Sequence, residues 1–414
     1  MAEAPEAAQP ALGEELRALA LISLGNAEYW AARFEDAERY LDQGVALARR
    51  IGRPYLEFTG LVYAASLEFY GSASLAVEHG RQAAELAEQH GWTDEPGAGF
   101  ASLIVGAVLV WQARLEEAEP WILRAERTLR AEADPVAGLV AHSIRGVLEL
   151  ARGQDADALA AFQAADRLAG RLAEPDLVVL PNRAFLVQTL ARFGETQRAE
   201  QALAALADQD RDSGIMRISL AALRLAQDDP HAAVAALAPV LDGSVPMPWP
   251  GWLVQAFLLE AIARDALGDP AAGRALERAL DLAEPDGALT NFLLHPAPGL
   301  LQRQARQRTA HPALIADILS LLAGHKLVPL PAGPRPPLEP LSDSEIRVLR
   351  YLPTNLSGPE IAGELYVSHN TVRTHISHVY AKLGTHTRAE TVARARALGL
   401  LAPSPLGGQA RHAG

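Results

Sequence analysis

The sequence contains no cysteine, and this absence excludes several classes of protein and of site. A disulfide framework, a thiolate metal site and a cysteine nucleophile all require this residue. Lysine is also scarce, because only Lys326 and Lys382 occur among the 37 basic residues. The N-terminus has no basic segment followed by an apolar core, so we expect no signal peptide. No apolar stretch provides the roughly 20 residues that a membrane helix needs. We therefore expect a cytoplasmic protein without a membrane partner.

Sequence motifs for enzymatic chemistry are missing as well. The chain has no G-x-x-x-x-G-K-[ST] motif and no Gly-Lys pair, so nothing predicts ATP hydrolysis. His375 and His378 have a helical spacing that two metal ligands could use, but no third ligand is indicated. We predict no enzymatic activity, no cofactor and no bound metal.

The net charge of −13 argues against DNA as a partner when it is taken as one number. The charge is unevenly distributed, however, because Leu341–Gly414 contains eight basic and five acidic residues. This segment carries a net charge of +3, and the preceding 340 residues carry −16. The overall charge therefore describes the long N-terminal part and does not exclude DNA binding by the C-terminal part.

One spacing recurs along the first 300 residues: a small or turn-forming residue stands five positions before a second small residue. The pairs are Ala32/Ala37, Gly71/Ala76, Ala113/Ala118, Gly153/Ala158, Gly194/Ala199, Asp228/Ala233 and Gly268/Gly273. Successive pairs are 34 to 42 residues apart, which fits two helices and two turns per repeat. Strand signals are almost absent. We predict an all-α array of about seven helix-pair units over residues 1–300.

The small-residue pattern resembles tetratricopeptide-like repeats from about Leu16 to Leu282. This resemblance implies a right-handed superhelix with a concave surface that binds a small-molecule or protein effector. The alternative is a structural spacer. We expect the aromatic residues of the first three units to lie in the core and not to form a ligand box.

A domain boundary is predicted after the array. His311–Leu322 has the apolar spacing of one more helix, and residues 328–340 contain six prolines, which favours an extended linker. We assign residues 301–340 to this terminal helix and linker, 341–401 to a second domain and 402–414 to a flexible tail.

The second domain contains explicit helix-start signals. Three capping boxes are present: Ser342/Glu345, Ser357/Glu360 and Thr387/Glu390. Together with Ser368 as the N-cap of the third helix, they predict four helices: Asp343–Leu352, Gly358–Leu365, His369–Leu383 and Arg388–Leu398. Only three residues separate the second helix from the third, which is the spacing of a helix-turn-helix.

The third helix carries the strongest functional signal. Val372, Ile376, Val379 and Leu383 fall on one apolar seam. The opposite face has no acidic residue and presents candidates for contacts with nucleic acid: Asn370, Thr371, Arg373, Thr374, Ser377 and His378. Arginine and asparagine can make bidentate contacts to guanine and adenine edges. This face is therefore suited to the major groove.

The motifs Leu341-Ser342-x-x-Glu345, Leu356-Ser357-x-x-Glu360-Ile361-Ala362, Val367-Ser368-x-x-Thr371-Val372-Arg373-x-His375 and Lys382-Leu383-Gly384 closely resemble the LuxR-type DNA-binding domain. The resemblance implies a four-helix domain that binds two half-sites as a dimer. Bases would be contacted by Arg373, Thr374 and Ser377. Phosphates would be contacted by Thr371, His375, Lys382 and Arg388. Dimer contacts would come from Val392, Ala395 and Arg396. For His375, a partly buried packing role is the alternative.

A repeat array ahead of such a domain resembles the C-terminal part of the large ATP-binding, maltose-activator-type LuxR regulators, without their NTPase module. We therefore predict a transcription regulator that binds double-stranded DNA as a homodimer, with RNA polymerase as a further candidate partner. The alternative is a repeat scaffold whose main role is to bind a partner protein. The sequence does not identify the effector, the operator or the direction of regulation.

Overall fold

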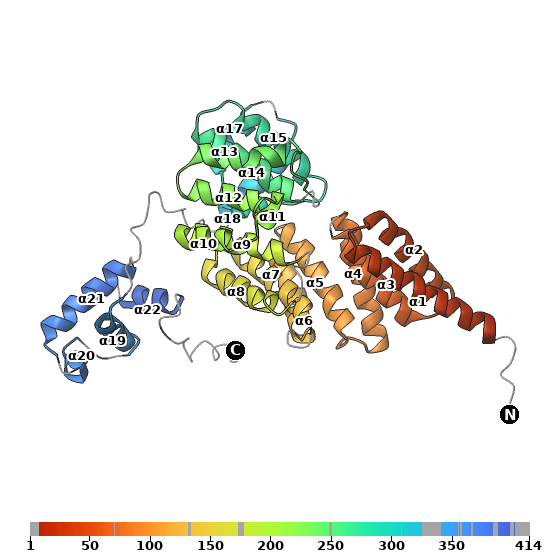
Figure 1. Cartoon of the computed structure of the whole chain (residues 1–414), viewed down its shortest axis with the longest axis horizontal. Coiled ribbons are helices and arrows are strands. Elements are labelled where there is room, and N and C mark those ends of the chain that lie inside the picture. The colour runs from red at the N-terminus through yellow and green to blue at the C-terminus, as the bar shows by residue number, and fades with distance from the viewer. Residues whose placement is uncertain are drawn as a thin grey trace. The chain divides into compact units, whose positions relative to one another are not determined.

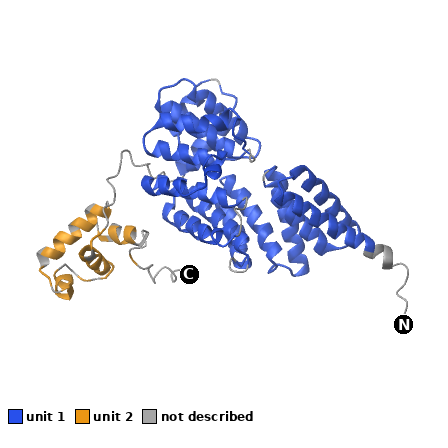
Figure 2. Cartoon of the chain, in the orientation of Figure 1, with its two compact units in different colours: residues 1–330 blue, residues 331–414 orange. Residues whose placement is uncertain are grey.

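The computed structural model describes residues 8–69, 71–130, 134–172, 178–247, 251–307, 309–324, 341–354, 356, 358–365, 367–383, 388–397 and 401. Helices and their connections make up these ranges, which contain no strand, so the predicted all-α fold is confirmed. The chain divides into two compact units, Met1–Leu330 and Pro331–Gly414 (Figure 2). None of the described helices is long and apolar enough to cross a membrane.

Seven helix pairs, here called the array, build most of the N-terminal unit (Figure 1). Their bounds are α1 (Ala8–Trp30) with α2 (Phe34–Arg50), α3 (Pro54–Glu68) with α4 (Ala73–His90), α5 (Pro96–Trp111) with α6 (Leu115–Thr128), α7 (Pro135–Ala151) with α8 (Asp155–Ala169), α9 (Val179–Arg192) with α10 (Thr196–Ala204), α12 (Gly214–Ala226) with α13 (Pro230–Leu241), and α14 (Gly251–Ala266) with α15 (Ala272–Ala283). The short α11 (Asp208–Arg211) follows α10. The first helices of successive pairs pack side by side.

The recurrent five-residue spacing has a direct structural cause. Its first member lies in the turn between the two helices of a pair and, in six of the seven pairs, adopts a left-handed backbone, with φ of 58° at Ala32 and 79° at Gly194. Ala113, Gly153, Asp228 and Gly268 share this conformation. The alanines that form the second member are completely buried: Ala37, Ala76, Ala118, Ala158, Ala199 and Ala233. The first member therefore reverses the chain, and the second lets the helices approach closely.

Close packing of glycine against aromatic rings shows how tightly the core is fitted. A Cβ atom added to Gly146 on α7 would lie 2.6 Å from the ring of Phe162 on α8. Phe162 is completely buried and stacks on Phe185 of α9 at 5.6 Å between ring centroids. Shape complementarity, rather than apolar character alone, therefore joins these helix pairs.

The chain after the array folds back onto the first helices of three pairs, α5, α7 and α14. It forms α16 (Thr290–Leu294), α17 (Pro298–Ala305) and α18 (Pro312–Gly324). α16 packs against α5, α7 and α14. The Thr290 hydroxyl donates to the Val110 carbonyl, and the Arg192 guanidinium donates to the Leu294 carbonyl at 2.9 Å. The chain itself therefore occupies the surface of these three first helices where α16 packs.

The C-terminal unit contains four short helices, α19 (Asp343–Tyr351), α20 (Gly358–Leu365), α21 (His369–Leu383) and α22 (Arg388–Ala397). All four helices begin at the residue that the sequence predicts, and each ends within one residue of its predicted end. Two small apolar clusters hold them, one around Val372 and one around Val379. The predicted Pro-rich linker and the C-terminal tail lie outside the described residues.

Candidate nucleic-acid interface

The turn between α20 and α21 is fixed by a side-chain cap. The Thr371 amide donates to the Ser368 Oγ at 3.1 Å, and the two hydroxyl oxygens lie 2.7 Å apart. Ser368 is therefore the N-cap of α21, as predicted. The hydroxyl-bearing residues of two predicted capping boxes, Ser357 and Thr387, lie outside the described residues.

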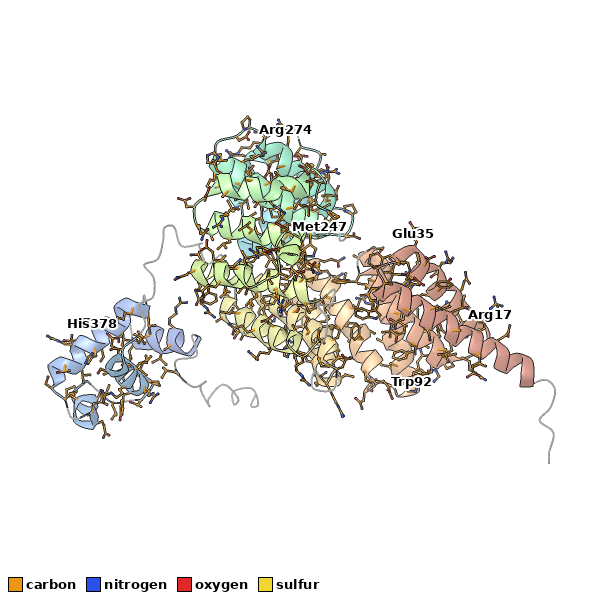
Figure 3. The ribbon with its side chains drawn as sticks, viewed as in Figure 1. Arg17, Glu35, Trp92, Met247, Arg274 and His378 are labelled. Carbon is orange, nitrogen blue, oxygen red and sulfur yellow. The ribbon has the colours of Figure 1, made fainter. Side chains whose placement is uncertain are left out.

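α21 separates a buried seam from an exposed face. Val372 and Val379 are completely buried and Leu383 is 5% exposed, so the predicted seam is confirmed. Arg373 and Thr374 are exposed on the other side, as is His378, which Figure 3 labels. Asn370 and Ser377 were predicted on the same face, but their side chains lie outside the described part of the structure. The exposed face combines hydroxyl, imidazole and guanidinium groups, and α21 contributes no carboxylate, which suits a polyanionic partner. The His378 Nδ1 lies 3.6 Å from the Glu345 carboxylate of α19.

His375 occupies an intermediate position on α21. The side chain of His375 is half-buried. Its Nδ1 atom is inaccessible to solvent and has no hydrogen-bond partner within the described part of the chain. This placement favours the packing interpretation of His375 over the expected phosphate contact.

A charged cluster joins the start of α19 to the end of α21. The Ser342 amide donates to the Glu345 carboxylate at 2.7 Å, and the Glu345 amide donates to the Ser342 hydroxyl at 3.4 Å, so this predicted capping box is confirmed. The Lys382 ammonium donates to the same carboxylate at 2.9 Å. Burial alone would raise the pKa of Glu345, but the hydrogen bonds from Ser342 and Lys382 lower it to about 2. The carboxylate thus stays ionised and holds α21 against α19.

Arg388 is directed into its own domain. Its guanidinium donates to the carbonyl oxygens at the end of α19 and in the following loop: Tyr351 at 3.2 Å, Leu352 at 2.9 Å, Thr354 at 2.8 Å and Leu356 at 2.7 Å. The Tyr351 carbonyl also accepts from the Thr354 amide at 3.1 Å and from the Thr354 hydroxyl at 2.7 Å, so Arg388 adds to the hydrogen bonds that close the end of α19. The expected phosphate contact of Arg388 is therefore revised to a structural role, because its donors already face four acceptors.

The residues of α22 that were predicted as dimer contacts differ in burial. Ala395 is completely buried in the apolar cluster of its own domain, so it cannot contact a partner subunit, and its expected role is revised. Val392 is partly buried at the edge of the same cluster. The side chain of Arg396 lies outside the described residues.

The contacts of Lys382 with Glu345 and of Arg388 with the carbonyls after α19 were not predicted from the sequence. Glu345 and Lys382 are 37 positions apart, and Arg388 is more than 30 positions from each of its acceptors. The capping box marked Glu345 as a helix-start residue, but no local pattern reveals a second partner so distant in sequence. The four-helix fold brings these groups together.

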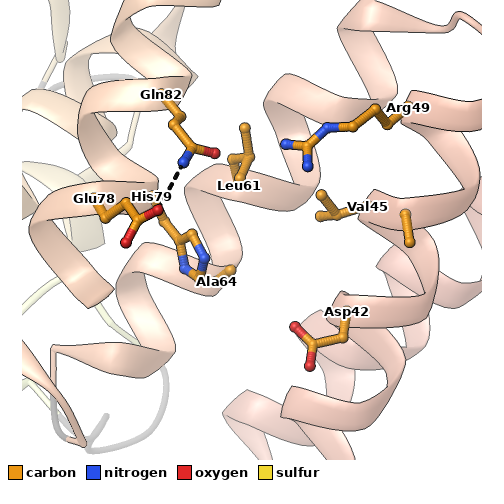
Figure 4. Close-up of a pocket in the computed structure, with 9 residues that line it drawn as sticks. Asp42, Val45, Arg49, Leu61, Ala64, Glu78, His79 and Gln82 are labelled. Carbon is orange, nitrogen blue, oxygen red and sulfur yellow. Dashed lines mark hydrogen bonds between the residues drawn. The ribbon is translucent and has the colours of Figure 1, made fainter. Parts of the chain in front are cut away.

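The array carries a cavity of about 270 Å³ between α2, α3 and α4 (Figure 4). Its lining is mixed in charge and includes Asp42, Arg49, Glu78 and His79. Burial lowers the pKa of His79, so its imidazole is neutral near pH 7. Such a lining can accept and donate hydrogen bonds to a small polar molecule.

Family models match both parts of the chain. Residues 5–307 match the MalT-like TPR region, and residues 339–395 match the luxR family of bacterial regulatory proteins. The first match covers more than half of the chain, and the second covers the four short helices almost completely.

Curated relatives match the C-terminal segment. The Fimbriae Z protein of Escherichia coli K12 is 46% identical over 52 residues, which are 13% of this chain and 25% of that protein. The transcriptional regulatory protein NarL of Mycobacterium tuberculosis is 47% identical over 55 residues, which are 13% of this chain and 26% of NarL. The chain thus spans about a quarter of the length of these relatives.

Proposed function

Because this chain belongs to the family with the MalT-like TPR region and carries a luxR-family domain, we propose that it is a transcription regulator whose α21 enters the major groove of DNA. The observation that carries the proposal is the exposed face of α21, where Arg373 and Thr374 stand on a helix whose sequence contains no acidic residue. A buried seam on the other side fixes the rotation of the helix, so this face is directed outward.

The side chains have different proposed roles. Arg373 and Thr374 read bases, together with Asn370 and Ser377 on the same helical face. Thr371 and His378 contact phosphates and set the register of the protein on DNA. The Lys382 ammonium, which is paired with Glu345 and 21% exposed, is a further phosphate contact at the rim. Two copies bind two half-sites, with Val392 and Arg396 of α22 at the dimer contact.

The test is selection of bound sites from a random DNA pool, followed by affinity measurements with variants. Arg373→Ala should cost about 1–3 kcal/mol on the preferred site and relax one base position. Arg350→Ala removes the same charge from the exposed side of α19 and serves as the matched control. An equal loss for both variants on every sequence would contradict base reading by Arg373, and the absence of any enriched site would contradict the proposed function.

We propose that the array senses an effector. The mixed-charge cavity beside His79 supports a small polar molecule as the ligand, because the first-helix surface at α5, α7 and α14 is already occupied. Site selection with and without cell extract tests this role. If the selected sites and their affinities are the same in both conditions, the sensing role fails while DNA binding stands.

A further inference from the structure

The cavity of about 270 Å³ in the array lies between the second helices of the first two pairs. Its walls are α2 and α4, and both helices pack on α3, which contributes Leu61 to the floor. Figure 4 shows Asp42 and Arg49 on one wall and Glu78 and His79 on the other. The volume is just below the range of about 300–1,000 Å³ that is typical of ligand pockets, so the cavity suits a small molecule.

The next groove along the array is bridged by the chain itself. Its walls are α4 and α6, and both helices pack on α5. Arg124 of α6 pairs with Glu88 of α4 at 2.8 Å, and its guanidinium lies over the Trp121 ring at 5.6 Å from the centroid. A cation therefore joins the two walls of this groove.

The repeat spacing explains why the first groove differs from the second. The buried alanines of the recurrent spacing align the second helices, so α6 follows α4 by 42 residues. By this offset, Gln82 stands on α4 where Arg124 stands on α6, and His79 stands where Trp121 stands. The α4 wall of the cavity thus lacks the cation and the large ring that the next groove contains.

The charged groups of the cavity are mainly acidic once their partners are included. Arg49 donates to the Glu57 carboxylate of α3 at 2.7 Å, which compensates its positive charge. The Glu78 carboxylate accepts from the neutral amide of Gln82 at 3.1 Å. Within the described part of the chain, neither Asp42 nor Glu78 forms an ion pair. Two uncompensated carboxylates therefore line opposite walls.

The negative potential extends beyond the lining. Glu68 of α3 is half-buried, and burial together with the negative charges of Glu38 and Asp42 raises its pKa. Burial lowers the pKa of His79, although the charges of Glu78 and Asp42 act in the opposite direction. Because the imidazole is neutral near pH 7, it does not balance these carboxylates. This part of the groove is therefore favourable for a positive charge from outside the chain.

We propose that the effector of the array is a small organic cation, bound in this cavity with its ammonium group between Asp42 and Glu78. An ammonium group has three hydrogen-bond donors and can pair with both carboxylates. It would join α4 to α2 as Arg124 joins α6 to α4, while the apolar part of the ligand packs on Val45 and Leu61. This inference rests on the proposed sensing role and deepens it.

The class of ligand is tested with three probes of similar length: n-butylammonium, butan-1-ol and butyrate. Their binding to the full chain without DNA is measured by saturation-transfer NMR at constant ionic strength, because salt screens exposed charges. We expect n-butylammonium to bind at least about tenfold more tightly than butan-1-ol, and butyrate to bind more weakly than both. Equal affinity for the ammonium and the alcohol, or no saturable binding of n-butylammonium in the millimolar range, would overturn the proposal.

The place of binding is tested by removing one carboxylate. Asp42→Asn should weaken n-butylammonium binding about fivefold or more, because the ammonium loses one of its two charged acceptors. Asp317→Asn removes the same charge from an exposed position on α18 and is the matched control, which should bind like the unmodified chain. An equal loss in both variants would show a general attraction to the acidic surface and contradict the cavity as the site.

A second variant fills the cavity without changing its carboxylates. His79→Trp gives α4 the residue that stands at the equivalent position of α6, and the larger ring should abolish n-butylammonium binding. Circular dichroism during urea unfolding should show that the array remains folded. Unchanged binding by the folded His79→Trp variant would place the ligand elsewhere and overturn the proposal.

These measurements contain no DNA, so they separate the cationic ligand from the sensing role. If n-butylammonium does not bind but cell extract changes the selected DNA sites, the sensing role stands and the cationic ligand is wrong. If n-butylammonium binds in the cavity but extract changes nothing, the cation site stands and the sensing role fails.

Discussion

The array and the C-terminal unit solve the problem of holding short helices together in different ways. In the array, adjacent helix pairs share apolar clusters, the largest of which extends from α5 to α18, and Gly146 lies against the ring of Phe162. In the C-terminal unit, two small apolar clusters are supplemented by the Glu345 carboxylate and the Arg388 guanidinium. The difference teaches that close packing over a large core dominates in the array, whereas the small C-terminal domain depends more on directed polar contacts to hold α21.

The largest effect is expected when a buried aromatic side chain of the array is removed, and this tests how far the stability of the array depends on close packing. Phe162→Ala should lower the free energy of unfolding of the array by about 3–5 kcal/mol, because it leaves a cavity against Gly146 and Phe185. All six tryptophans lie before residue 253, so tryptophan fluorescence in urea reports on the array alone. Leu123→Ala, at an exposed position, should change this transition by less than about 0.5 kcal/mol. Similar effects of both variants would refute a shape-dependent core.

A smaller effect is expected for the polar cluster of the C-terminal unit. Glu345→Gln should reduce its stability by about 1.5–3 kcal/mol, because Lys382 and the start of α19 lose a charged acceptor. The measurement is amide hydrogen exchange over residues 341–397 in the full chain. Glu364→Gln on the exposed side of α20 is the control.

The same carboxylate gives a pH signature. Because folding lowers the pKa of Glu345 to about 2, its contribution is present above about pH 4.5 and is lost as the pH falls toward 2. Glu345→Gln should remove this acid dependence of hydrogen exchange, and Glu364→Gln should keep it. Unchanged acid dependence in Glu345→Gln would show that other carboxylates govern the transition.

The smallest effect is expected where the array uses a polar contact. His311, 6% exposed, lies between Asp281 at 2.8 Å and Glu284 at 3.0 Å. Burial lowers the pKa of His311, but the hydrogen bonds and charges of these carboxylates outweigh burial and raise it overall. The charged form is favoured in the folded chain, so its contribution is complete below about pH 6.5 and is lost as the pH rises through the raised pKa.

Fluorescence-detected unfolding of the array should therefore show slightly lower stability at pH 8.5 than at pH 6, by at most about 1 kcal/mol. His311→Gln should abolish the difference, whereas His231→Gln, at an exposed position, should preserve it. A pH effect that persists in His311→Gln would remove this histidine as its source.

Much of the fold was predictable because its signals are local. The five-residue spacing marks a left-handed turn residue and a buried alanine, and both are set by the geometry of two helices joined by a short turn. The apolar seam of α21 follows from helical periodicity between Val372 and Leu383, and the cap at Ser368 follows from the chemistry of its hydroxyl. These features depend on residues within a few turns of one another.

The assigned roles of several C-terminal residues could not be predicted, because position in a motif does not reveal where a long side chain is directed. Arg388 and Lys382 looked like cations available to phosphate, yet one faces four carbonyls and the other pairs with Glu345. Ala395 looked like a dimer contact and is completely buried. Each of these outcomes depends on residues that the sequence separates by 30 or more positions.

The sequence by itself determined the helices, the pairing of neighbours in the array and the acid-free face of α21, because hydrophobic periodicity, turn residues and charge act over short distances along the chain. Only the tertiary structure decided that α16 packs against α5, α7 and α14, that Ala395 is buried in its own domain and that Arg388 supports α19 instead of facing solvent. These decisions depend on which distant surfaces meet, and burial and hydrogen bonding are defined only once they have met.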